Sequence, residues 1–160
     1  IAQDALDIAV CSGPDNITGD ALGFEETVWA AKAGLKIDRN KPAPLGVLDR
    51  SCWWRDVPTD ALRSIDRDYD VVFHSSSFAS LLAAIRSGYA IGVLPASSLS
   101  ENVVQLRSSD GFPKLARSRR SILIAAQGSN VLTKAMGDAI REPRAHHQSA
   151  NTTAVFTDRR

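Results

Sequence analysis

The sequence predicts an α/β fold in which parallel strands alternate with helices. The clearest support comes from one segment, Asp70 to Leu99. It contains the apolar run Val71–Phe73, then three serines and a helical pattern, then a second apolar run that ends at a proline. β-Branched and aromatic residues favour buried strands, and a helix between two strands is typical of a parallel crossover. We therefore expect Val71–Phe73 and Ala90–Leu94 to be parallel neighbours joined by a right-handed helical crossover.

The helix of this unit is predicted from its spacing and its ends. Its apolar positions recur at helical intervals: Phe78, Leu81, Leu82 and Ile85. Gly88 stands where a helix would stop. Ser75, Ser76 and Ser77 line the helix start, at the C-terminal edge of the predicted sheet. Free N–H groups, the positive dipole end and the hydroxyls together suit a small polar or anionic ligand. The alternative is a helix cap with two spare serines.

Three short apolar runs near the amino terminus predict strands: Ala5–Val10, Thr27–Lys32 and Leu45–Leu48. A turn rich in glycine, proline and aspartate follows the first, and the polar loop Gly34–Pro44 precedes the third. A helical pattern comes next and contains Pro58. Because proline is tolerated only in the first turn, we expect that helix to begin near Asp56 or Thr59, or to be kinked there.

Beyond the central unit the sequence predicts a strand, a second strand and a helix: Val103–Leu106, Ser121–Ala126 and Val131–Ile140. The last helix places four apolar residues on one face: Leu132, Ala135, Met136 and Ile140. Residues 142–160 show no periodic spacing of apolar residues, which indicates a flexible tail. The alternation of strands and helices favours a parallel sheet with helices on both faces.

Composition limits the possible function classes. With 160 residues and 44% hydrophobic content the chain can bury one sizeable core, but it is too short for two full domains. Its net charge of +1, with one short Arg117–Arg120 cluster, does not predict a nucleic-acid surface. No apolar stretch reaches the ~18 residues of a membrane span. Two cysteines, Cys11 and Cys52, form no disulfide framework, so a reducing cytoplasmic setting is expected.

Five segments follow one another in an order that matches a known family: Asp7–Val10, Val28–Lys32, Cys52–Arg55, Asp70–Leu99 and Ser121–Ile124. The fourth contains the pattern Ser-Ser-x-x-x-x-Leu-x-Ala-x-x-x-Gly-x-x-Ile-x-x-Leu-Pro, which is fairly specific. Over roughly residues 5–141 the chain resembles the effector-binding domain of LysR-type transcriptional regulators. The resemblance implies a type II periplasmic-binding-protein-like fold: two Rossmann-like α/β subdomains, two crossing strands between them, and an effector in the cleft.

The resemblance also implies a domain division. Residues 1–31 and 113–141 would form subdomain I, and residues 32–112 subdomain II. Subdomain I would be incomplete, because family domains open with a βαβα segment before the strand that matches Asp7–Val10. The winged helix-turn-helix through which the family contacts DNA has no counterpart here either. Open strand edges invite pairing with another chain, so we expect a homodimer or tetramer.

The family comparison assigns candidate ligand-binding residues. In the family, the helix start that matches Ser75, Ser76 and Ser77 faces the effector. A second group should lie on the cleft rim, between a strand and a helix: Cys52, Trp53, Trp54 and Arg55. If that segment is extended, its two tryptophans cannot both enter one core, so one forms an aromatic wall or packs at a turn. The arginine suits either a carboxylate ligand or an ion pair.

Cys11 and Ser12 end the first predicted strand, which would place them at the opposite rim of the cleft or simply in a turn. Cys52 also resembles the reactive cysteine of a peroxide-sensing family member. A helix start and a nearby arginine lower a thiol pKa. However, Ala61 stands where a resolving cysteine would be needed, which favours a small pocket-lining cysteine.

These observations lead to an effector-sensing regulatory domain that is not an enzyme and needs no cofactor. Its expected partners are a small molecule, a second copy of the chain, and DNA through a domain outside this sequence, with no membrane contact. A type II solute-binding protein is the main alternative, and a thiol enzyme using Cys52 with His74 is another. The pair His146–His147 has no third ligand at useful spacing, so no metal site is expected.

Overall fold

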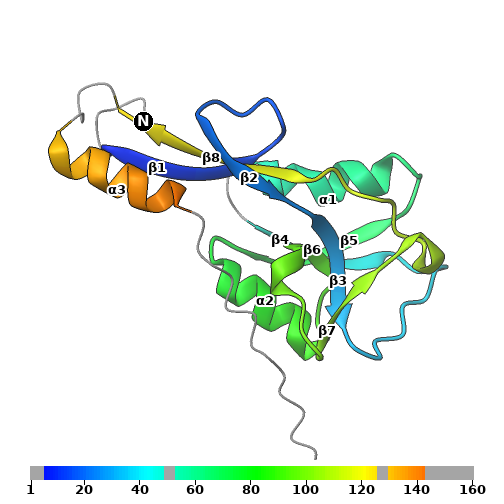
Figure 1. Cartoon of the computed structure of the whole chain (residues 1–160). Helices are drawn as coiled ribbons and strands as arrows, with labels where there is room; N and C mark the ends of the chain where they lie inside the picture. Colours follow the sequence, from blue (N-terminus) through cyan, green and yellow to red (C-terminus); the bar gives the residue numbers. More distant parts are fainter. Residues whose placement is uncertain (1–5, 49–52, 126–129, 143–160) are drawn as a thin grey trace, which may run out of the picture.

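The computed structural model describes residues 6–48, 53–125 and 130–142. The strands within these ranges are β1 (Ile8–Gly13), β2 (Asp20–Glu25), β3 (Thr27–Lys32), β4 (Ala43–Leu48), β5 (Tyr69–Ser75), β6 (Gly92–Pro95), β7 (Val103–Leu106) and β8 (Ser118–Ile124). The helices are α1 (Trp53–Arg63), α2 (Phe78–Ser87) and α3 (Val131–Arg141), with short 3₁₀ turns at Ala96–Ser98 and Ser108–Asp110. They form two lobes, one of β1, β2, β8 and α3, and one of the other elements (Figure 1). Cys52, the histidine pair and the predicted tail from residue 143 onward lie outside the described residues.

The second lobe is built on a mixed sheet. β4 and β5 pair in parallel, and β3 pairs antiparallel with both β6 and β7. A parallel bridge between Leu45 and Ile91 joins these two parts. The Ile91 N–H donates to the Pro44 carbonyl at 2.8 Å, and the Gly46 N–H donates to the Ile91 carbonyl at 2.7 Å. The resulting strand order is β5-β4-β6-β3-β7.

This order corrects one expectation. Val71–Phe73 and Ala90–Leu94 are not neighbours, because β4 lies between them. The reason is burial: Ala43 and Leu45 of β4 are completely buried, whereas β5 has no fully buried residue and leaves Val71 exposed. The more apolar strand occupies the interior of the sheet, and the half-exposed strand takes its edge.

Two cores lie on opposite faces of this sheet. The core on the α1 face contains Trp29, Ala31, Ala43, Leu45, Leu62, Ile91, Val93, Phe112 and Leu115. The core on the α2 face contains Ala30, Leu81, Ile85, Leu94 and Val103. Successive residues of β3 alternate between the two, as the period of a strand requires. The strand predicted at Thr27–Lys32 is therefore confirmed, and it is buried on both faces.

Helix α2 agrees with the prediction at both ends. Ser77 is its N-cap, and its hydroxyl accepts a hydrogen bond from the Ser80 N–H at 3.4 Å. Gly88 closes the helix in the left-handed region at φ 82°. A side chain there would be strained, which explains the glycine.

Helix α1 begins earlier than predicted, at Trp53, and runs through Pro58 to Arg63. The predicted start near Asp56 or Thr59 is therefore wrong. The Pro58 ring is fully buried, so packing against the core offsets the hydrogen bond that proline cannot donate. The Thr59 hydroxyl donates to the Asp56 carbonyl at 3.0 Å in the same turn.

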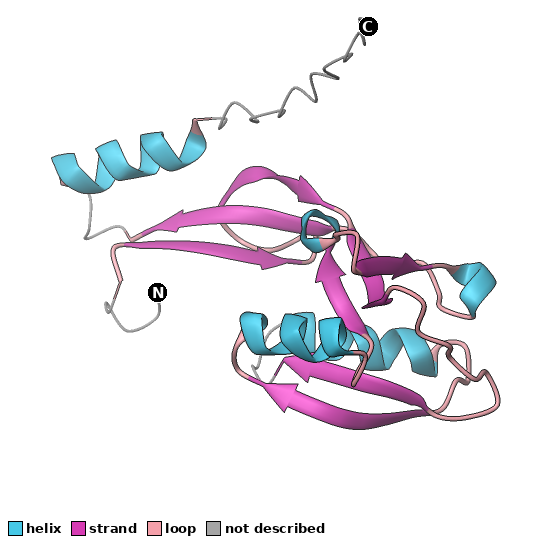
Figure 2. Ribbon diagram, turned by 90° about the horizontal axis from the view of Figure 1, so that it is seen from below, coloured by secondary structure: helices cyan, strands magenta, loops and turns pink. Residues whose placement is uncertain are grey.

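The first lobe is an antiparallel sheet in which β8 lies between β1 and β2. Strand β2 was not predicted, because it has a register shift at Ala21/Gly23 and no fully buried residue, so its alternation is weak. Helix α3 lies along one face of this sheet (Figure 2). It turns Thr133 and Gly137 inward, and a Cβ on Gly137 would lie 3.0 Å from Ile124 Cδ1. Its predicted apolar face is present but exposed, with Leu132 80% accessible.

The first prediction concerns Trp29, which is 2% exposed and packs against Phe112 with ring centroids 5.1 Å apart and ring planes at 49°. Its indole N–H donates to the Pro113 carbonyl at 3.0 Å. Replacing Trp29 with alanine should lower the free energy of unfolding by about 3–5 kcal/mol, through lost burial and an orphaned carbonyl. Urea titration checks this. Tyr89→Ala, at an exposed position, is the control and should change stability by less than about 0.5 kcal/mol. Equal losses in both variants would contradict the assigned role of Trp29.

The second prediction concerns the α2 cap. Ser77→Ala removes the acceptor for the Ser80 N–H. Thermal or urea unfolding should show a loss of about 0.5–2 kcal/mol. Ser97→Ala, at an exposed serine outside any α-helix, serves as control and should fall within about 0.5 kcal/mol of the parent chain. A Ser77→Ala variant as stable as the parent would show that the cap contributes nothing.

Candidate functional site

The carboxyl ends of β4 and β5 lie side by side, because Leu48 and Ser75 are paired in register. Helix α1 begins at Trp53, shortly after β4, and α2 begins at Phe78, shortly after β5. Two helix N-termini therefore follow the same sheet edge, which we call the carboxyl edge. Each brings backbone N–H groups that its own helix does not use, and the positive end of a helix dipole. Helix α1 also contacts β1, so the first lobe lies against this helix (Figure 1).

The three serines have different surroundings. The half-buried Ser75 accepts a hydrogen bond on its hydroxyl from the Ser77 N–H at 3.1 Å. Ser77 is the N-cap described above. The side chain of Ser76 is exposed. Ser77 is therefore the cap that the alternative interpretation supposed, but Ser75 also accepts a hydrogen bond there rather than being spare. Contact of Ser76 with a ligand stays a prediction, for which its exposure is the structural support.

The segment around the two tryptophans is helical rather than extended. Trp53 opens α1, and Trp54 is half-buried and packs against the core on the α1 face. Of the two alternatives for a tryptophan, core packing therefore describes Trp54. Arg55 is exposed and lines a hollow of about 460 Å³ between α1, β4 and β5, together with Tyr69 and His74. Cys52 lies outside the described residues, so its proposed redox role and its distance from His74 stay untested.

Cys11 and Ser12 do not end their strand. β1 continues to Gly13, and the two residues pair with Ser121 and Arg120 of β8. Both are half-buried, and Cys11 is a free thiol. The expectation that they belong to a turn is wrong because the β8 ladder holds the backbone extended through residue 13. Their contact with a ligand stays a prediction.

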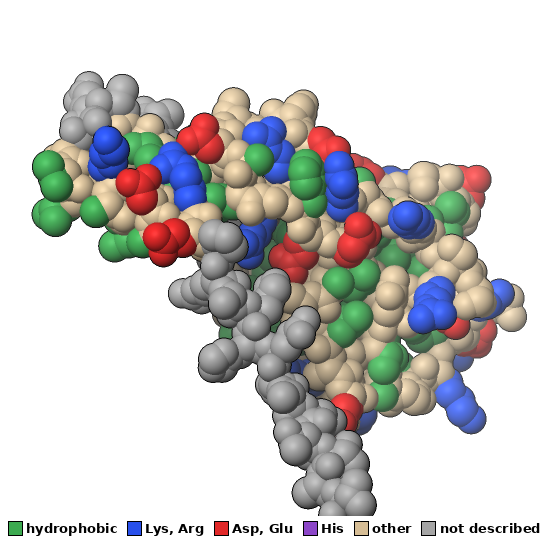
Figure 3. Space-filling model, in the orientation of Figure 1, with side chains coloured by type: hydrophobic (Ala, Val, Ile, Leu, Met, Phe, Trp, Pro, Cys, Tyr) green, Lys and Arg blue, Asp and Glu red, His purple; other side chains and the backbone are tan. Residues whose placement is uncertain are grey.

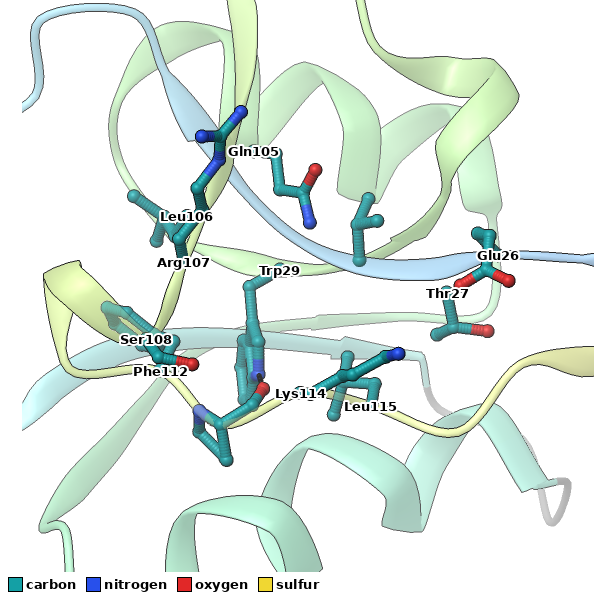
Figure 4. Close-up of a pocket in the computed structure, with 12 residues that line it drawn as sticks. Glu26, Thr27, Trp29, Gln105, Leu106, Arg107, Ser108, Phe112, Lys114 and Leu115 are labelled. Carbon is teal, nitrogen blue, oxygen red and sulfur yellow. Dashed lines mark hydrogen bonds between the residues drawn. The ribbon is translucent and has the colours of Figure 1, made fainter.

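A second pocket, of about 230 Å³, lies where the chain crosses between the lobes, and the sequence did not predict it. Trp29 forms part of its wall, the side chains of Glu26 and Thr27 lie at one end, and Lys114 points toward them from the middle of the pocket (Figure 4). Thr27 is 4% exposed, and its hydroxyl has no hydrogen-bond partner among the described residues. The lining comes from segments far apart in the chain, so no local pattern marks this pocket. Only the position of Thr27 at the start of a buried strand could have indicated it.

Within the described ranges, no three His, Cys, Asp or Glu side chains gather in a way that suits a metal ion. In the same ranges no helix is long and apolar enough to span a bilayer.

Comparison with known proteins identifies the family. Residues 1–146 match the family model of the LysR substrate binding domain. Among curated proteins, the HTH-type transcriptional regulator DgdR of Burkholderia cepacia is 30% identical over 88% of this chain and 48% of its own length. PecT of Dickeya dadantii is 23% identical over 100% of this chain and 51% of its own length. The chain thus spans about half the length of the curated relatives that it matches.

Solved structures agree on the fold. The regulatory domain of CcmR from Synechocystis, solved in complex with 2-PG, has a TM-score of 0.63 at 16% identity, over 88% of this chain and 74% of that one. Vibrio fischeri DarR, solved in complex with DNA, has a TM-score of 0.67 at 14% identity, over 88% and 52%. The mixed α/β structure is thus the type II periplasmic-binding-protein-like fold of LysR regulatory domains. The chain belongs to the LysR substrate-binding domain family.

Proposed function

We propose that this chain is the effector-sensing domain of a bacterial LysR-type transcriptional regulator, and that it binds a small polar or anionic molecule at the carboxyl edge. The observation that carries the proposal is the meeting of two helix N-termini at this edge, beside a helix that contacts the first lobe. Such an edge in an open α/β sheet supplies oriented N–H donors without needing charged side chains. Ser76 is the side chain proposed to contact the ligand, with Arg55 on the neighbouring helix.

The proposed mechanism is a shift between lobe orientations. A ligand held between the lobes favours the orientation in which both lobes contact it. The ligand can shift the equilibrium between two orientations only by the difference in its binding free energy for them. The lobes meet through two chain crossings, at Glu26 and near residues 113–117. We propose the division that the resemblance implies, residues 1–31 with 113–141 and residues 32–112, with its first boundary moved to Glu26. By sheet membership the first crossing falls at Glu26, since all of β3 joins the second lobe.

The proposal for the whole protein includes binding to DNA. The relatives DgdR and PecT are named as HTH-type regulators, and DarR was solved with DNA. We propose that this domain acts in the cytoplasm and reaches DNA through a winged helix-turn-helix outside the present sequence. The family match does not favour a solute-binding protein. Both the family and these relatives are regulators rather than enzymes, so catalysis by Cys52 with His74 is not proposed.

The third prediction tests the carboxyl edge. Thermal-shift screening of the chain against a panel of metabolites should find a compound that raises the melting temperature. A ligand at 100 times its Kd adds about 2.7 kcal/mol to the free energy of unfolding. Ser76→Leu should abolish most of that shift with little loss of stability in the absence of ligand, because the side chain is exposed.

Ser64→Leu is the matched control, since Ser64 is also exposed but follows the opposite end of α1. It should keep the full ligand-induced shift. Equal shifts in Ser76→Leu and Ser64→Leu would remove the carboxyl edge from the proposal. A Cys52→Ser variant that loses the shift while Ser76→Leu keeps it would instead move the proposed ligand contact to Cys52.

We also propose that the chain forms a homo-oligomer. The supporting observation is the exposed apolar face of α3, where Val131, Leu132 and Met136 are 85%, 80% and 57% accessible. Figure 3 shows hydrophobic side chains at the surface of this end of the molecule. A contiguous exposed apolar patch of this kind is typical of interaction surfaces.

The fourth prediction follows from that patch. Light scattering of the purified chain should give at least twice the mass of one chain. The double substitution Leu132→Glu with Met136→Glu should shift the population toward the monomer, because charges in an apolar interface must be desolvated. Ile65→Glu, at another exposed apolar residue, is the control and should leave the mass unchanged. A parent chain that is monomeric at all concentrations would contradict the proposal.

A further inference from the structure

Three basic side chains gather at the end of the second lobe opposite the carboxyl edge. Arg39 and Lys41 lie in the loop before β4, and Arg67 lies in the turn before β5. These segments precede parallel strands, so they lie at the amino ends of β4 and β5. Together with Asn40, Ile65, Asp66, Asp68 and Gly111 they line a pocket of about 300 Å³. We call it the amino-edge pocket.

Arg67 is held in place by two contacts. Its Nη1 donates to the Gly111 carbonyl at 3.0 Å, and its guanidinium lies 4.4 Å from the centroid of the Phe112 ring. Its Nε and Nη2 atoms are shielded from solvent and have no hydrogen-bond partner among the described residues. A cation that is partly desolvated in this way keeps its charge at a cost. Desolvation lowers the pKa of Arg67 from its usual value, and the neighbouring Arg39 guanidinium lowers it further.

Arg39 is fixed beside this cation. Its Nη2 donates to the Ser109 carbonyl, while the side chain remains exposed. Two guanidinium groups are therefore kept close together by carbonyls of the same 3₁₀ turn region, at Ser109 and Gly111. Like charges that are anchored near one another repel, and the repulsion is stronger where solvent is partly excluded.

The surrounding carboxylates do not neutralise this pair. Asp66 and Asp68 also line the pocket, so its three cationic side chains face two carboxylates, and both carboxylates are exposed and therefore partly screened by solvent. Among the described residues, no carboxylate forms an ion pair with either Arg39 or Arg67. Lys41 has one partner, Asp38 at 4.0 Å, and both side chains are largely exposed, so this contact is weak. The lining thus carries a small excess of positive charge, and neither arginine is in an ion pair among the described residues.

We propose that the amino-edge pocket is a second ligand site, which binds a small molecule carrying a phosphate group. Arg39 and Lys41 are exposed and able to donate to phosphate oxygens, and Arg67 supplies a fixed positive charge behind them. Guanidinium and ammonium donors suit a dianion, whose charge relieves the repulsion between the two arginines. This site lies at the opposite sheet edge from the proposed effector contact, so it does not rest on the proposed function.

The test uses inorganic phosphate as the probe, at constant ionic strength maintained with sodium chloride. Titration of the purified chain, followed by phosphorus NMR line width and by calorimetry, should show saturable binding. Arg39→Gln with Lys41→Gln should weaken the affinity at least tenfold. Lys36→Gln with Lys134→Gln removes the same charge from exposed lysines outside the pocket and should retain the parent affinity.

A further variant separates geometry from charge. A Cβ on Gly111 would lie 2.5 Å from Arg67 Nη1, and the glycine has φ +83°. Gly111→Ala should therefore displace the guanidinium and weaken phosphate binding with no change in net charge, while circular dichroism confirms that the chain is folded. Absence of saturable binding to the folded parent chain would overturn the proposal. Equal weakening by the Lys36/Lys134 control would overturn it too, because it would show nonspecific attraction by net charge.

Discussion

Trp29 connects three parts of the chain: its own strand β3, the Phe112 ring, and the Pro113 carbonyl that accepts its indole N–H. Residues 112–115 lead from the second lobe back toward β8 of the first. The two residues that follow it, Ala30 and Ala31, are small and are completely or almost completely buried in opposite cores. One strand thus forms part of both cores and fixes the point where the chain returns. The relative placement of the lobes depends on this arrangement, so the proposed shift between lobe orientations would act through it.

The sequence predicted correctly those helices and strands whose ends are determined by neighbouring residues in the chain. Helix α2 was predicted at both ends because Ser77 caps it and Gly88 adopts the left-handed conformation that stops it. Strands β3 and β7 were predicted because their apolar runs are short and bounded. Strand order was not predictable in the same way. β4 displaces β5 from the position beside β6 through the burial of Ala43 and Leu45, a tertiary preference that no single segment reveals. Likewise Pro58 sits in mid-helix because its ring is buried, which sequence rules for proline do not anticipate.

The candidate sites also differ in whether neighbouring residues or tertiary packing determine them. The serine-lined helix start was found from sequence, since strand, serines and helix are contiguous in the chain. Which serines act in the cap required the structure, because the hydrogen bonds to Ser75 and Ser77 distinguish residues of one type. The amino-edge pocket could not be found from sequence. Arg39, Arg67 and Gly111 are far apart in the chain and meet only through the amino ends of β4 and β5.

The central claim is that the carboxyl edge holds the effector, and amide hydrogen exchange tests it most directly. A compound that stabilises the chain should be added at saturation, and exchange should be compared with and without it. The account predicts slower exchange near residues 53–56 at the start of α1 and at Phe78 and Ala79 at the start of α2, because these N–H groups are proposed to face the ligand. The N–H groups of Ser77 and Ser80 already donate to serine hydroxyls and should change less. Slower exchange confined to other regions, such as α3 or the loop at residues 33–42, would contradict the claim.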